Sequence, residues 1–183
     1  MNLRRIVSST VVGLAVPLVV GAVPPLAHAQ PPDSLTLSDL TCTRVGIGDY
    51  WHVAQPISIG RQYYDTVAYM GRSLDYGLRQ SEVAEVVCNL NSIGSAPPLK
   101  TLTLTVGLQD GDFHVDEVTS ILVSIYRDGK IYQTKPVMSG RPVQWLVDLQ
   151  NVESIAVTSQ CATPAVNSPY CPNLYILTDS LTR

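Results

Sequence analysis

Aromatic and polar side chains of types that suit sugar binding gather at two places in the chain. The first place holds Tyr50, Trp51 and His52, followed by the pair Tyr63 and Tyr64, in a segment with few aliphatic residues. Tyr and Trp offer a flat apolar face that stacks on a sugar ring while polar neighbours bond its hydroxyls. The second place, Gln109 and Asp110, would supply such neighbours. The predicted carbohydrate-binding residues are therefore Tyr50, Trp51, His52, Tyr63, Tyr64, Gln109 and Asp110.

The alternative for each aromatic residue is an ordinary place in the core or at its rim. Tyr126 and Tyr132 flank a predicted turn and fit that alternative, and Trp145 lies in an apolar stretch typical of a core strand. For Trp51 the two interpretations are equally balanced.

Groups that could perform catalysis are few. Outside residues 1–29 the histidines are His52 and His114, and the sequence contains neither a GxSxG nucleophile elbow nor a phosphate-binding glycine loop. A lone histidine near a loop is more often a surface residue than a general base. Any carboxylate pair for glycoside hydrolysis would have to be chosen among 15 acidic residues, and no spacing singles one out. We therefore predict a protein that is not an enzyme.

The acidic loop at residues 110–117 resembles a calcium site at first sight, because calcium prefers several converging oxygen ligands. Its spacing fits an EF-hand poorly, since Gly111 is misplaced and the twelfth position lacks a glutamate. A solvated turn is the favoured interpretation. The prediction is no cofactor, with a structural calcium ion kept as the open alternative.

Short apolar runs separated by turn residues predict strands rather than helices. Residues 99–106 alternate strictly, with Leu on one face and Lys or Thr on the other, which indicates a half-buried strand. Only residues 65–79 resemble a helix, and Gly71 and Gly77 weaken that assignment. About eight strands at this spacing predict an all-β jelly roll or β-sandwich. The predicted strands are residues 35–45, 57–59, 83–90, 99–106, 121–126, 131–132, 143–149, 155–158 and 174–177.

Two local signals constrain the fold further. Asp128-Gly129 between two β-rich runs predicts a tight hairpin. The four cysteines, an even number in an exported chain, predict two disulfides, for which three pairings are possible. We favour Cys42–Cys88 and Cys161–Cys171, because the second pair closes a short proline-containing loop.

The N-terminus predicts export. Arg4 and Arg5 precede an apolar run, and Ala27-His28-Ala29 matches a signal-peptidase site, so residues 1–29 are predicted as a cleaved signal and 30–34 as a short lead. An uncleaved membrane anchor is the alternative, but prolines interrupt the run. Removing residues 1–29 removes two of the 12 basic and none of the 15 acidic residues, leaving a net charge of −5. An acidic chain of this kind argues against nucleic acid and anionic lipid as partners, and no later apolar run is long enough for membrane insertion.

The order and spacing of several segments resemble those of a known type of domain. Residues 37–40, the glycine-flanked segment 71–78 followed by 85–90, and the strand–glycine–strand–DGK succession of 102–107 and 123–130 together resemble an NPCBM-type domain. This type of carbohydrate-binding module is attached to glycoside hydrolases of secreted bacterial enzymes. The sequence departs from it at Ser81, Ala84 and Gln109, which affects ligand identity more than fold.

The resemblance implies a jelly roll over residues 35–183 that binds sugar, with galactose-containing glycans as ligands in some relatives. We therefore predict a secreted, non-catalytic, lectin-like module. The alternative is a secreted β-sandwich that has lost sugar binding and docks a protein partner or sits on a cell surface.

Overall fold

The computed structural model describes residues 35–73, 77–94 and 98–183. The predicted signal (1–29) and lead (30–34) lie outside the described residues and stay predictions. Among the described residues, no helix has the length and apolar character needed to cross a membrane.

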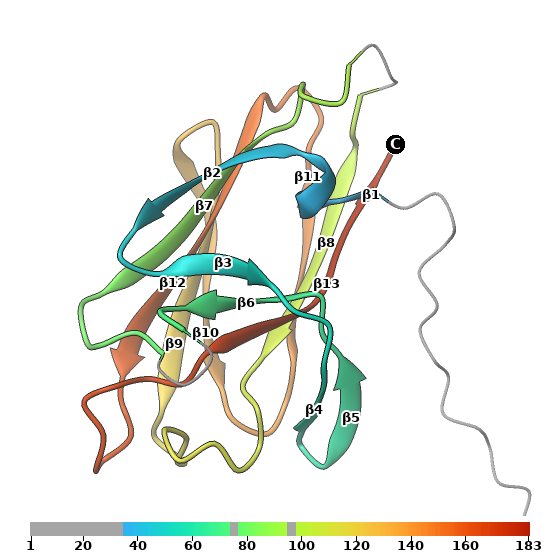
Figure 1. Ribbon diagram of the computed structural model, residues 1–183. Coiled ribbons are helices and arrows are strands. Elements are labelled where there is room, and N and C mark those ends of the chain that lie inside the picture. Colours follow the sequence, from blue (N-terminus) through green and yellow to red (C-terminus); the bar gives the residue numbers. More distant parts are fainter. Residues whose placement is uncertain (1–34, 74–76, 95–97) are drawn as a thin grey trace, which may run out of the picture.

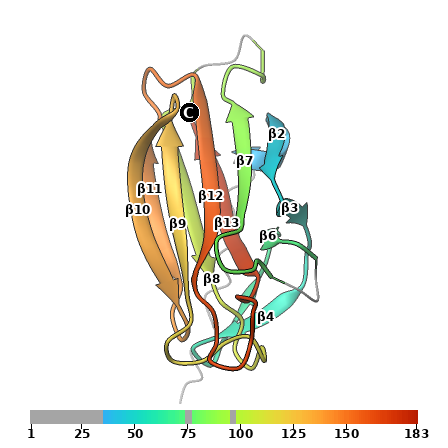
Figure 2. The ribbon, with the colours of Figure 1, turned by 90° about the vertical axis from the view of Figure 1, so that its left-hand side faces the viewer.

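Two antiparallel sheets face each other as a sandwich (Figures 1 and 2). The first sheet has the order β11 (Val143–Asp148), β8 (Thr101–Gly107), β13 (Leu174–Thr182), β6 (Ala68–Gly71) and β3 (Asp49–His52), and β1 (Leu35–Thr36) also pairs with β13. The second sheet has the order β10 (Lys130–Met138), β9 (Ser120–Arg127), β12 (Ser154–Thr163), β7 (Val83–Asn89) and β2 (Thr41–Gly46). A separate hairpin consists of β4 (Pro56–Ile59) and β5 (Gln62–Asp65), and a single 3₁₀ turn, η1 (Leu37–Asp39), joins β1 to β2. The predicted all-β sandwich is confirmed.

The core lies between the sheets and follows from the alternation seen in sequence. In β8 the residues Leu102, Leu104 and Val106 are fully buried, while the intervening threonines are only half-buried. Side chains of a strand point alternately to its two faces, so one apolar face of β8 packs inward. Trp145 on the neighbouring β11 is 1% exposed, which confirms its predicted place in the core.

The predicted hairpin at Asp128-Gly129 joins β9 to β10. Both residues have positive φ, 47° and 74°, as a type I′ turn requires. The Asp128 carboxylate also accepts hydrogen bonds from the backbone N–H groups of Glu153 and Ser154, at 3.0 and 2.9 Å. This turn is therefore fixed both by its backbone preference and by contacts to the start of β12.

Both favoured disulfides are present. Cys42 and Cys88 lie directly opposite each other on β2 and β7, and Cys161 and Cys171 close the loop between β12 and β13. The predicted pairing is thus confirmed, and the described residues contain no free cysteine.

The described residues contain thirteen strands, not about eight, and the additional ones surround the candidate site. The local sequence pattern did not predict β3, β5 and β6, and the one predicted helix, residues 65–79, is wrong over its described part, where β6 forms. All four residues of β6 are buried because it lies between β3 and β13, with packing on both faces. A short strand buried on both sides shows no alternation, so its pattern does not distinguish it from a helix.

Candidate functional site

A row of aromatic side chains crosses the outer face of the first sheet. Trp51 of β3 lies opposite Tyr69 of β6, which lies opposite Tyr175 of β13, and Gly107 of β8 continues the row. The rings of Trp51 and Tyr69 are stacked, with centroids 6.5 Å apart and planes 20° apart, and those of Tyr69 and Tyr175 are 6.3 Å apart. Directly opposite residues of neighbouring strands bring their side chains into contact. The row therefore forms one continuous apolar surface.

The β4–β5 hairpin covers most of this row. Ile57 and Ile59 form a small second core with Tyr69 and Tyr175, and Tyr64 packs against it. Gly107 leaves the room that Ile59 fills, because a Cβ atom at Gly107 would come within 2.4 Å of the Ile59 side chain. Tyr69 and Tyr175 are consequently 5% and 4% exposed, whereas Trp51, beyond the hairpin, is 38% exposed. Trp51 is thus the solvent-exposed end of the aromatic row, and its ring stacks on the buried Tyr69.

Asp110 fixes the hairpin to the loop after β8. Its carboxylate accepts hydrogen bonds from the Ser58 hydroxyl at 2.8 Å, the Gly60 N–H at 3.0 Å and the Arg61 N–H at 2.9 Å. The bond from Arg61, followed by those from Ser58 and Gly60, lowers the pKa of Asp110 below its ordinary value. Gln109 beside it is half-buried. Asp110, predicted as a partner for sugar hydroxyls, therefore already serves as a clamp within the chain.

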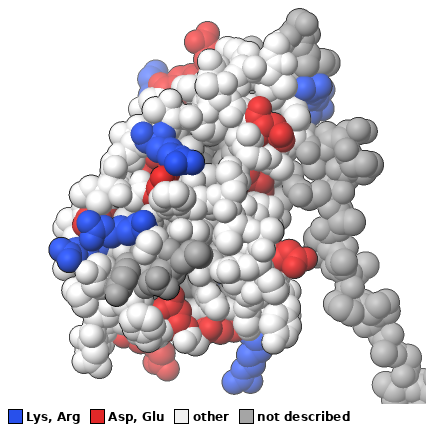
Figure 3. All heavy atoms as spheres, viewed as in Figure 1, with Lys and Arg blue, Asp and Glu red and all other residues white. Residues whose placement is uncertain are grey.

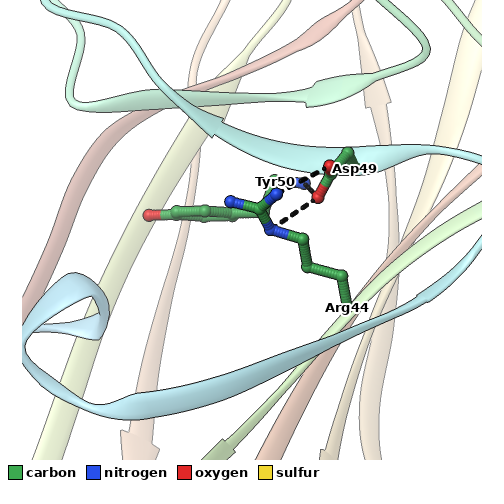
Figure 4. A network of polar contacts seen from close by, with 3 residues as sticks. All are labelled: Arg44, Asp49 and Tyr50. Carbon is green, nitrogen blue, oxygen red and sulfur yellow. Dashed lines mark hydrogen bonds and ion pairs between the residues drawn. The ribbon is translucent and has the colours of Figure 1, made fainter.

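Beside Trp51, Arg44 and Asp49 form an ion pair, which Figure 4 shows without the Trp51 side chain. The Arg44 Nε lies 2.9 Å from Asp49 Oδ1, and its Nη1 donates to Oδ2 at 3.0 Å. The guanidinium carbon lies 5.4 Å from the centroid of the Trp51 ring, within the range of a cation–π contact. This two-point pairing uses two of the five N–H donors of the guanidinium and leaves three for other partners.

Tyr50 and His52 lie on the opposite face of β3 from Trp51, as alternation along a strand requires. Tyr50 is only 5% exposed, and its hydroxyl donates to Asp179 Oδ2 at 2.9 Å. His52 is exposed and contacts the Tyr50 ring edge-on, with centroids 5.3 Å apart. A buried ring cannot stack on a sugar, so Tyr50 leaves the candidate set, and His52 does not converge with Trp51.

Tyr63 and Tyr64 are also separated by strand alternation. Tyr64 turns toward the second core and donates a hydrogen bond to Gln62 Oε1 at 2.8 Å, while Tyr63, on the other face of the hairpin, is 86% exposed. Trp51 lies beside charged groups on an open surface, with the Arg44 guanidinium over its ring and Asp49 paired to that guanidinium. Arg44 and Asp49 were not predictable as site residues, because no local sequence pattern separates this ion pair from the other charged residues.

The acidic loop is held by its own carboxylates. Asp112 accepts from the His114 N–H at 2.8 Å, and Asp116 accepts from the N–H groups of Thr119 and Val166 at 2.9 and 2.8 Å. His114, expected at the surface, is 4% exposed, and its Nδ1 lies 2.6 Å from the Ser168 hydroxyl. Over the described parts of the chain, no group of three or more His, Cys, Asp or Glu side chains is placed to hold a metal ion.

A buried carboxylate connects the strands behind the site. Asp179 of β13 is 1% exposed, and its Oδ2 accepts hydrogen bonds from Tyr50 of β3 and from the Leu37 N–H of η1, the latter at 3.1 Å. Burial raises the pKa of Asp179 above its ordinary value, although the donors Tyr50 and Leu37 oppose the rise. The native state therefore holds this proton more tightly than the unfolded chain does.

This shift predicts a pH-dependent contribution to stability. A raised pKa in the native state stabilises the protein below the unfolded-state pKa, and that stabilisation is lost as the pH rises through the native-state pKa. The substitution Asp179→Asn keeps an oxygen acceptor without the charge, so the variant should lack this contribution, and its unfolding free energy relative to that of the parent should rise from pH 4 to pH 7. Urea denaturation at pH 4, 5, 6 and 7 checks this, and parallel pH profiles for parent and variant would contradict it.

The fold of this chain is similar to that of several solved structures. No protein-family model matches the sequence, and no curated protein gives a significant match. Solved structures do match. The tandem CBM51 modules of the family 98 glycoside hydrolase Sp3GH98 from Streptococcus pneumoniae superpose with a TM-score of 0.58 at 12% identity, over 95% of this chain and 52% of theirs.

Two structures from Clostridium perfringens are similar as well. The CBM51 of its GH95, in complex with methyl-galactose, gives a TM-score of 0.55 at 12% identity over 81% of this chain and 99% of its own. The CBM51-2 and INT domains of ZmpB give 0.53 at 16% identity over 81% of this chain, which spans only 31% of that structure. At such identities the likeness concerns the fold, and this chain has the β-sandwich fold of CBM51 carbohydrate-binding modules.

Proposed function

We propose that this protein is a secreted, non-catalytic carbohydrate-binding module whose ligand stacks on Trp51. The observation that carries the proposal is the half-exposed Trp51 ring, supported from behind by Tyr69 and flanked by the Arg44–Asp49 ion pair. An indole face suits the apolar side of a pyranose ring, and the Arg44–Asp49 pair, whose guanidinium lies over the same indole ring, suits the hydroxyls. The fold shared with CBM51 modules supports the same function.

Within this site, Arg44 would donate to sugar hydroxyls and the Asp49 carboxylate would accept from them. Because the two charges compensate each other, the site favours a neutral sugar over an anionic one. The molecule is acidic overall, and on the face that contains β2 and β3 basic and acidic side chains are interspersed (Figure 3), which gives no field that attracts anions.

The sugar class follows from the same reasoning. The solved neighbours were crystallised with methyl-galactose in one case and GlcNAc in another, both neutral pyranoses. Galactose-containing glycans are therefore the first ligands to test, in agreement with the NPCBM resemblance of the sequence. Two disulfides and the predicted signal sequence support an extracellular location.

A glycan-array screen of the oxidised protein tests the proposal. We expect binding to a related set of neutral glycans, abolished by an excess of the free monosaccharide. A blank array from protein whose circular dichroism and thiol count show a folded, oxidised state would contradict the proposal and favour the alternative, a β-sandwich that docks a protein.

A further inference from the structure

The carboxyl group of Asp179 lies in the core behind the Trp51 site. It is 1% exposed, and Asp179 lies opposite the fully buried Leu104 of β8, so both side chains point between the sheets. Its Oδ2 accepts two hydrogen bonds, whereas Oδ1 forms none with any other described residue. A buried oxygen without a donor costs more free energy when it carries charge. The packing around Asp179 therefore favours the neutral carboxyl group.

The two hydrogen bonds of Oδ2 hold segments that carry the site. Tyr50, whose hydroxyl donates to Oδ2 at 2.9 Å, lies between Asp49 and Trp51 in β3. The Leu37 N–H, at 3.1 Å, belongs to η1, which leads into β2. Strand β3 is the edge of the first sheet and pairs there only with β6, whereas β13 is the middle strand (Figure 1). The Tyr50–Asp179 bond therefore ties an edge strand of the site to the centre of the sheet.

Two titratable side chains act on Asp179, and both belong to β3. They are Tyr50 and the exposed His52, whose rings meet edge-on with centroids 5.3 Å apart. The other elements packed against β13 bring the apolar core residues of β6 and β8, the uncharged β1 and, in η1, Asp39, which is exposed and accepts a hydrogen bond from the Thr36 N–H. Burial raises the pKa of Asp179, and its two hydrogen-bond donors and a charged His52 offset only part of the rise.

We propose that Asp179 is a positioning residue for the Trp51 site, and that the site binds its ligand more tightly when this carboxyl group is neutral. An ionised Asp179 gains water only if an element that covers it moves, and β3 at the sheet edge moves more easily than β8. Asp49 and Trp51 flank Tyr50, so a shift of β3 disturbs the stacking face and the ion pair together. Affinity should therefore fall as the pH rises through the native pKa of Asp179. This inference rests on the proposed sugar site.

Isothermal titration of the oxidised full chain with the strongest glycan from the array, at pH 4, 5, 6, 7 and 8, measures the coupling. We expect the parent to lose affinity with rising pH, by about fivefold or more over the range. Asp179→Asn is neutral at every pH and should give a flat profile. His52→Gln removes a charge that favours ionisation of Asp179, so the fall should persist and move to higher pH. A fall that His52→Gln abolishes and Asp179→Asn keeps would assign the effect to His52 and overturn the inference.

Tyr50→Phe keeps the test valid if Asp179→Asn does not fold. It removes only the hydroxyl that joins β3 to Asp179, so affinity at pH 4 should fall and its dependence on pH should shrink. A variant that removed only general stability would leave the shape of the pH profile unchanged.

Nuclear magnetic resonance of the Trp51 indole N–H follows the site without a ligand, and Trp51→Phe distinguishes its signal from that of Trp145. The signal should shift with pH at the same midpoint as the carboxyl carbon of Asp179, and should not shift in this way in Asp179→Asn. If it does so while no glycan binds at any pH, the positioning role stands and the proposed function alone fails. An indole signal that does not follow Asp179, or parallel affinity profiles for parent and Asp179→Asn, overturns the inference.

Discussion

Replacing Trp51 with alanine is expected to abolish detectable glycan binding while leaving the fold intact. The ring is 38% exposed and supplies the open face of the aromatic row. An aromatic anchor at the centre of a binding site contributes about 2 kcal/mol or more, which corresponds to a roughly 30-fold or greater loss of affinity. Isothermal titration with the strongest glycan from the array measures the change, and thermal denaturation reports on the fold.

Tyr132→Ala is the matched control for this substitution. Tyr132 is an aromatic residue of the other sheet, 41% exposed, with the Arg127 guanidinium 5.3 Å from its ring, so it repeats the Trp51–Arg44 arrangement far from the site. Its removal should leave affinity unchanged. If Trp51→Ala binds glycan as the parent does, the stacking surface lies elsewhere. Tyr63, 86% exposed on the hairpin, would then be the next residue to replace.

Much of the sandwich was predictable because its central strands carry their own signals. Strict alternation in β8 and the Asp128-Gly129 turn each depend on a few neighbouring residues, and the structure confirms both. The disulfide pairing followed from loop length and proved correct. The strands around the site were not predictable from local sequence. Strands β3, β5 and β6 have four residues each, and contacts between distant segments determine their positions.

The candidate site was predicted only through Trp51. Neighbouring aromatics in the sequence, Tyr50 and Trp51 or Tyr63 and Tyr64, point to opposite faces once they occupy strands, so residues that look like one cluster become separate surfaces. The groups that do meet come from different strands: Arg44 from β2, Asp49 from β3 and Tyr69 from β6. The order of strands in the first sheet brings Tyr69 beside Trp51, and the short connection between β2 and β3, at the edges of different sheets, brings Arg44 to Asp49. Local sequence pattern encodes neither arrangement.

Loss of the Cys42–Cys88 disulfide is expected to lower stability more than loss of Cys161–Cys171. The first bond closes a segment of 46 residues and the second a segment of 10. By lowering the entropy of the unfolded chain, the two disulfides then contribute about 4 and about 3 kcal/mol, respectively, to the free energy of unfolding. Urea denaturation of the double variants Cys42→Ala/Cys88→Ala and Cys161→Ala/Cys171→Ala measures both, and the reverse order would show that native packing, not loop length, decides.

The longer loop also contains the candidate site. Strands β3 to β6, with Trp51, the hairpin and Tyr69, all lie between Cys42 and Cys88, and Arg44 is two residues from Cys42 on the anchored strand. Without the disulfide, only the ladder with β7 holds β2 in the second sheet. The strand that carries Arg44 is then held less firmly, which weakens the positioning of Arg44 against Asp49. The Cys42→Ala/Cys88→Ala variant should therefore bind glycan more weakly even at temperatures where it stays folded. The Cys161→Ala/Cys171→Ala variant, altered in a loop that contributes no residue to the Trp51 site, should retain the parent affinity.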